Sequence, residues 1–213
     1  MIEIIKNFQT IKSSINNSNV NIIVVSKTFS FDKIKPLIDF GHHHFGENKV
    51  QEAKAKWYEI KKKNSNIQLH MIGKLQSNKA KEAVELFDFI HSVDNKKLAI
   101  ALAKYENLQN KKNKYFIQVN LANESQKSGI DSDQLIDFYS FCKKISLNII
   151  GLMCIPPNHK DSQKYFIELA KLNNILKLKE ISMGMSADYL SAVQCGSTFV
   201  RIGSAIFGDR ATK

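Results

Sequence analysis

Short apolar segments alternate with amphipathic segments along the whole chain, and this alternation predicts strands and helices in turn. Several apolar segments run without polar interruption, as expected of parallel strands that are covered on both faces. The predicted strands are residues 21–27, 43–46, 69–73, 89–93, 115–120, 149–155, 180–184 and 199–203.

The segments between these strands carry apolar residues at helical spacing, and a leading helix is predicted over residues 4–15. Gly41 and Gly196 stand where helices should end. The predicted N-caps are Asn48, Ser77, Asp94, Asp131 and Ser186.

Eight strands with helices between them predict an α/β fold, a single (β/α)8 TIM barrel with an extra N-terminal helix. A doubly wound open sheet is the alternative, and the number of strands favours the barrel. No linker, repeat or low-complexity segment interrupts the pattern, so we expect one domain over residues 1–213.

Composition is that of an ordinary globular protein, with 43% hydrophobic and 24% charged residues. No apolar run is long enough to span a membrane, and the first residues lack the features of a signal peptide. Cys142, Cys154 and Cys195 lie far apart, which suits a reducing compartment and predicts buried thiols. We expect a cytoplasmic protein without membrane contact.

A net charge of +11 raises the possibility of nucleic-acid binding. However, only Arg201 and Arg210 are arginines, so the side chain that dominates base and phosphate recognition is nearly absent. We therefore expect a solvated lysine surface and no nucleic-acid partner. A basic RNA-associated barrel remains the alternative.

The carboxyl ends of barrel strands share one face, which holds the site in this fold. Lys27 closes the first apolar strand, at the mouth of a low-dielectric interior that can lower a lysine pKa and free the amine for a Schiff base. The alternative is that its ammonium simply extends into water.

The last two strand-to-helix turns combine bare backbone N–H groups with two hydroxyls. One turn is Gly184-Met185-Ser186 and the other is Gly203-Ser204-Ala205, where this fold commonly binds phosphate. The alternative for Ser186 is a plain N-cap. The alternative for Asn48, three residues before Gln51, is a variant of the capping box.

Arg201 lies in an apolar strand, and alternation points it into the barrel. A guanidinium there needs a partner, because an unpaired buried charge is very costly. That partner is either a structural carboxylate or the ring nitrogen of a cofactor.

Several ordered segments resemble the pyridoxal phosphate homeostasis protein family, whose members are similar to the N-terminal barrel of alanine racemase. The matching segments are VVSKT, FGENKVQE, HMIGKLQSNKAK, QVNLANESQKSGI, GLMCIPP, ISMGMSADY and GSTFVRIGSAIFG.

The resemblance implies pyridoxal 5′-phosphate (PLP) as the cofactor, held as a Schiff base on Lys27. It implies that Ser186, Gly203 and Ser204 bind the phosphate and that Arg201 faces the pyridine nitrogen, with Asn48 close by. The departures are Ala187 at a commonly acidic position, Lys74 at a position that is usually histidine or proline, and the run His42, His43 and His44 in place of a mixed polar stretch. We predict no metal site, because neighbouring strand residues alternate faces.

The resemblance also implies a monomer in vitamin B6 homeostasis, without catalysis of its own and with PLP-dependent apo-enzymes as transient recipients. No tyrosine matches the second base of alanine racemase, and an arginine cannot protonate the ring. A PLP-dependent amino-acid racemase is the alternative function. Lys127, beside Gly129, is a candidate for a secondary anion contact.

Overall fold

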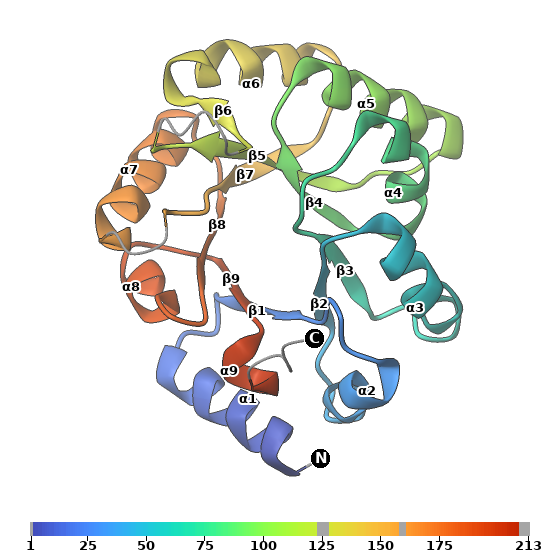
Figure 1. The fold of residues 1–213 in the computed structure, drawn as a ribbon. Coiled ribbons are helices and arrows are strands. Elements are labelled where there is room, and N and C mark those ends of the chain that lie inside the picture. Colours follow the sequence, from blue (N-terminus) through green and yellow to red (C-terminus); the bar gives the residue numbers. More distant parts are fainter. Residues whose placement is uncertain (1, 123–127, 158–160, 209–213) are drawn as a thin grey trace.

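A computed structural model describes residues 2–122, 128–157 and 161–208 of the chain. Parallel strands form a closed ring, with helices around the outside (Figure 1). The strands are β1 Asn21–Val25, β2 His44–Glu47, β3 Gln68–Met71, β4 Phe89–Val93, β5 Lys114–Asn120, β6 Ile130–Asp131, β7 Ile149–Met153, β8 Glu180–Met185 and β9 Phe199–Ile202.

The helices follow the strands in the order expected of a (β/α)8 barrel. The α-helices are α1 Ile2–Ile15, α2 Phe31–Asp39, α3 Val50–Lys63, α4 Ala80–Leu86, α5 Lys96–Gln109, α6 Leu135–Lys144, α7 Ser162–Ile175, α8 Tyr189–Gln194 and α9 Ser204–Phe207. Two 3₁₀ turns, η1 Ser77–Lys79 and η2 Ser132–Gln134, precede α4 and α6.

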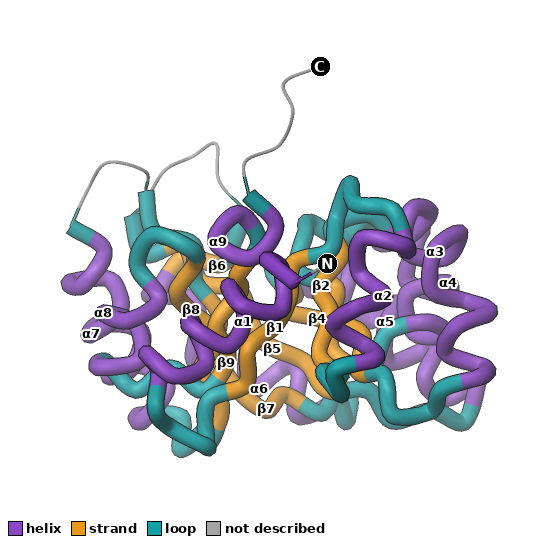
Figure 2. Tube along the Cα trace, turned by 90° about the horizontal axis from the view of Figure 1, so that it is seen from below, coloured by secondary structure: helices purple, strands orange, loops and turns teal. Residues whose placement is uncertain are grey.

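The ring runs β4-β3-β2-β1-β9-β8-β7-β5 and closes through parallel pairing of β4 with β5. The closed ring confirms the predicted barrel and excludes the alternative of an open sheet. The predicted N-terminal helix is also present, as α1. The two-residue β6 pairs with β5 beside the ring and was not predicted. Figure 2 shows the strands enclosed by the helices.

Alternation along the strands gives the barrel two apolar layers. The larger layer lies between strands and helices, and Val200 and Ile202 belong to it, as predicted. A small cluster fills part of the interior. Its buried members are Ile23, Phe89, Phe116, Met153 and Phe199.

The predicted helix ends are partly correct. Gly41 and Gly196 follow α2 and α8 with φ of +91° and +93°, the left-handed conformation that glycine adopts without strain. Asp131 precedes η2 as predicted, but its side chain makes no capping bond.

Four predicted N-caps are wrong by one or two residues. Lys49, Gln76, Asn95 and Asp188 occupy the positions predicted for Asn48, Ser77, Asp94 and Ser186. Polar residues are neighbours in each of these loops, so composition locates the helix start without fixing the capping residue.

Asn95 makes the capping bond of α5, because its Oδ1 accepts from the Leu98 N–H at 2.9 Å. Asn95→Ala should therefore lower the free energy of unfolding by about 1 kcal/mol in urea denaturation. Asn66→Ala is the matched control, because Asn66 is exposed in a loop, and it should change this free energy by less than about 0.5 kcal/mol. Equal losses in the two variants would show that the cap does not hold α5.

Candidate functional site

A cavity of about 310 Å³ opens at the carboxyl ends of β1, β8 and β9. Five of the six residues predicted to bind the cofactor line it, and we call it the Lys27 cavity. Its lining residues are Val25, Lys27, Phe29, Met185, Ser186, Ala187, Arg201, Gly203, Ser204 and Gly208.

Lys27 lies two residues beyond the end of β1, so the strand is shorter than predicted. Thr28 has a φ of 68°, and its backbone N–H donates to Glu52 Oε1 of α3 at 2.5 Å. The half-buried Lys27 therefore lies in a turn that a hydrogen bond to the outer helix α3 holds in place.

A buried ionic network supports this turn from the side of β2. Glu47 is fully buried, and its Oε1 accepts from Ser26 Oγ at 2.8 Å, Lys56 Nζ at 2.9 Å and Trp57 Nε1 at 2.9 Å. Lys56 Nζ also donates to the Ser26 backbone carbonyl at 2.8 Å. The residue directly before Lys27 is thus tied to β2 and α3.

The two turns predicted to bind phosphate lie against each other. Ser186 Oγ accepts from the backbone N–H groups of Gly203 and Ala205, both at 3.3 Å. Gly203 packs closely, because a Cβ built there would lie 3.2 Å from Val25 Cβ. A hydroxyl and backbone donors of this kind can bind an anion.

Asp188 stabilises the turn that contains Ser186, and the sequence did not indicate this role of Asp188. Its Oδ1 accepts from the Met185 backbone N–H at 2.7 Å. It follows Ala187, where the resemblance led us to expect an acidic residue, and a carboxylate is therefore present one position later.

Arg201 points into the barrel, as alternation predicts, and is 4% exposed. Its Nη1 donates to Ser182 Oγ at 2.7 Å, and its Nη2 donates to the Cys154 carbonyl at 2.8 Å. Among the described residues no carboxylate forms an ion pair with it. Burial lowers the pKa of Arg201, yet guanidinium remains charged in proteins.

Asn48 is not brought together with the other five residues. It lines a neighbouring cavity of about 360 Å³, with Gly73, Lys74 and Asn120 among its other residues. Its backbone is fixed there, because a Cβ on Gly73 would lie 2.4 Å from the Asn48 carbonyl oxygen. A role of Asn48 in cofactor binding stays a prediction.

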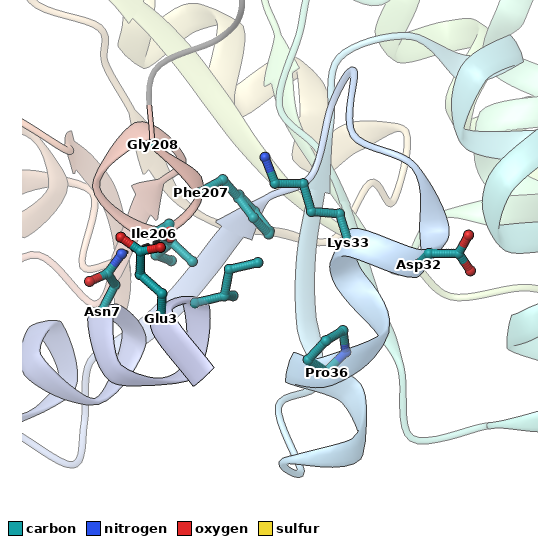
Figure 3. A pocket seen from close by; sticks show the side chains of 9 residues that line it. Glu3, Asn7, Asp32, Lys33, Pro36, Ile206, Phe207 and Gly208 are labelled. Atoms are coloured by element: carbon teal, nitrogen blue, oxygen red, sulfur yellow. Dashed lines mark hydrogen bonds between the residues drawn. The ribbon is translucent and has the colours of Figure 1, made fainter. Parts of the chain in front are cut away.

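A larger hollow of about 440 Å³ lies outside the barrel, between α1, α2 and α9 (Figure 3). Apart from Gly208 it shares no lining residue with the Lys27 cavity, and it contains none of the predicted site residues. Lys33 lies at its edge, and Lys33 Nζ is 4.7 Å from the ring centroid of Phe29.

The remaining candidates do not add chemistry to the Lys27 cavity. Cys142 and Cys154 are buried, as predicted, and burial raises the pKa of each thiol to about 12. Cys195 is only partly buried. Lys127 lies outside the described residues.

The rings of His42 and His44 are neighbours, with centroids 6.4 Å apart, but their nitrogens have different partners. His44 Nδ1 lies 2.9 Å from His70 Nε2. His42 Nε2 lies 2.8 Å from the His44 carbonyl oxygen, and its ring packs against Phe8 of α1. The part of the chain that the structure describes holds no group of three side chains placed to bind a metal ion. Nor does any described helix have the length and apolar character needed to cross a membrane.

Removing Lys56 should leave the buried Glu47 carboxylate without its cation. We expect Lys56→Met to lower the free energy of unfolding by roughly 3–5 kcal/mol, measured by urea denaturation. Lys35→Met is the control, because Lys35 pairs with Asp39 at the surface and should cost at most about 1 kcal/mol. Similar losses in both variants would mean that the Glu47 pair contributes little.

Comparison with known proteins shows a match along nearly the whole chain. The family model of the alanine racemase N-terminal domain matches residues 2–211. The pyridoxal phosphate homeostasis protein of Vibrio cholerae is 37% identical, over 91% of this chain and 86% of its own length. That of Synechocystis is also 37% identical, over 90% of this chain and 92% of its own length.

Solved structures give the same result. PipY of Synechococcus elongatus, with PLP bound, is 35% identical at a TM-score of 0.90, and the match covers 96% of this chain and all of PipY. Alanine racemase of Clostridium difficile is 11% identical at a TM-score of 0.77, and 58% of that enzyme is covered. At this identity the second likeness concerns the fold alone.

Proposed function

We propose that this chain, which belongs to the alanine racemase N-terminal domain family and to its pyridoxal phosphate homeostasis proteins, binds PLP in the Lys27 cavity. Family membership confirms the resemblance carried by the sequence motifs. The observation that supports the proposal most strongly is that one cavity gathers a lysine amine, an arginine and a turn of hydroxyl and backbone donors.

Each part of the cavity suits one part of the cofactor. PLP supplies an aldehyde that condenses with amines and a pyridine ring that can accept electron density. The Lys27 amine would condense with that aldehyde, with loss of one water. Ser186, Gly203 and Ser204 would hold the phosphate, and Arg201 would face the ring nitrogen. PipY, which matches this chain over its whole length, has PLP bound, and this supports PLP as the ligand.

We infer that the protein acts in vitamin B6 homeostasis, as the names of its relatives state. We further propose that the protein is a single-domain, cytoplasmic monomer and that it passes PLP to apo-enzymes in transient contacts. It includes no nucleic-acid partner.

Two features of the cavity support the proposal that the protein holds PLP without catalysis. Arg201 can only donate hydrogen bonds, so it cannot protonate a ring nitrogen and leaves the ring a weak electron sink. Among the described residues that line the cavity, no tyrosine is present to serve as a second base. Racemisation by two bases would therefore lack one of its proton carriers.

Lys27→Ala should abolish both the visible-edge absorbance of the PLP-loaded protein and the adduct that borohydride traps. The measurement is an absorption spectrum before and after reduction, followed by peptide mass mapping. Lys33→Ala is the matched control, because Lys33 lines the adjoining hollow and should leave both signals unchanged. Retention of the adduct in Lys27→Ala would assign the cofactor to another lysine.

PLP-loaded protein should racemise L-alanine and other L-amino acids no faster than free PLP at the same concentration. Chiral chromatography of timed samples measures this directly. The physical reason is the combination of a donor-only Arg201 and a missing second base. Turnover that exceeds free PLP and disappears in Lys27→Ala would favour the racemase.

A further inference from the structure

A chain of hydrogen-bonded side chains crosses the barrel interior and ends on Arg201. His44 of β2, His70 of β3 and His91 of β4 are joined by Nδ1–Nε2 contacts of 2.9 Å each. His91 Nδ1 then lies 2.9 Å from Ser182 Oγ of β8, and that oxygen accepts from Arg201 Nη1 at 2.7 Å. Five side chains from five strands thus form one connected line.

The two central imidazoles are sealed from water. His70 and His91 are fully buried, and their rings stack on Phe89 and Phe116 with centroid distances of 4.3 and 4.2 Å. Burial lowers the pKa of both imidazoles well below 6.5. A neutral imidazole has one donor nitrogen and one acceptor nitrogen, so each ring must donate at one end and accept at the other.

The direction of the line is set at Ser182, because Arg201 can only donate to it and the Ser182 hydroxyl proton then needs an acceptor of its own. Ser182 Oγ accepts from Arg201, and among the bonds of the described residues His91 Nδ1 is the acceptor available to its hydroxyl proton. His91 must then donate from Nε2 to His70 Nδ1, and His70 from Nε2 to His44 Nδ1. The line ends at the opposite mouth of the barrel, where His44 lines a hollow of about 630 Å³.

We propose that Ser182, His91 and His70 are positioning residues for Arg201: their one-way hydrogen bonds turn the Ser182 lone pairs toward the guanidinium and hold it at the Lys27 cavity. The role in cofactor binding rests on the proposed function. The orientation of the line belongs to the protein itself and does not depend on a cofactor.

The first test uses the unchanged, PLP-free protein. Nitrogen-15 NMR of labelled imidazoles should show His91, His70 and His44 as neutral rings with the proton on Nε2. A proton on Nδ1 of His91 would reverse the line and overturn the proposal. This result is independent of whether the protein binds PLP.

The second test compares PLP affinity and absorbance in variants of two buried serines, Ser182 and Ser197. Ser182→Ala should weaken binding roughly tenfold and shift the absorbance maximum, because a hydrogen bond to a charged group is lost. Ser182→Thr keeps the hydroxyl and should restore both. Ser197→Ala is the control, since every hydrogen bond of Ser197 Oγ within the described residues goes to a backbone carbonyl of β8 or β9, Met183 O at 2.8 Å among them.

The outcomes separate this proposal from the proposed function. If Ser182→Ala keeps the wild-type affinity and spectrum, or if Ser197→Ala changes them equally, Ser182 is not a positioning residue for Arg201. Neither result would contradict PLP binding through Lys27. A wild-type protein that binds no PLP would end the proposed function, and the NMR experiment would still decide the orientation of the line.

Discussion

The polar interactions inside this barrel depend on one buried cation, the guanidinium of Arg201. Arg201 is almost completely buried, and a buried charge is very costly unless hydrogen bonds replace its hydration. The barrel supplies a hydroxyl and a backbone carbonyl, which satisfy donors without cancelling the charge. The net positive charge therefore remains beside the Lys27 cavity, where it favours an electron-rich group. The hydrogen-bonded line through the histidines ends on one of these neutral partners, the Ser182 hydroxyl.

Parallel pairing explains why the sequence predicted so much of the site. Lys27 and Arg201 are far apart in the chain, but β1 pairs with β9 and β9 with β8, so their carboxyl ends are neighbours. Once the strands had been recognised, the residues that follow each one could be assigned to a common face. Alternation within β9 then placed Arg201 inside and Val200 and Ile202 outside, as the structure has them.

Other features depend on tertiary packing that no local pattern records. A glutamate at a strand end and a lysine on a charged helix read as solvated residues, and only the approach of α3 to β2 buries Glu47 against Lys56. Asn48 follows β2 closely, yet its contact with Gly73 directs it to the adjoining cavity. His44, His70 and His91 lie in three different strands, and the sequence gave no sign that their rings would meet. The two-residue β6 is too short for periodicity to detect.

The same interior that holds Arg201 also limits what the protein can do with a bound cofactor. A line of imidazoles usually suggests proton transfer, since each ring can accept at one nitrogen and donate at the other. Here the line stops at a guanidinium, which has no lone pair with which to receive a proton. A proton entering at His44 could therefore travel no further than Ser182, and the ring nitrogen expected beside Arg201 would stay unprotonated. Under the proposed function, that arrangement would favour holding PLP over carbanion chemistry, because an unprotonated ring is a weak electron sink.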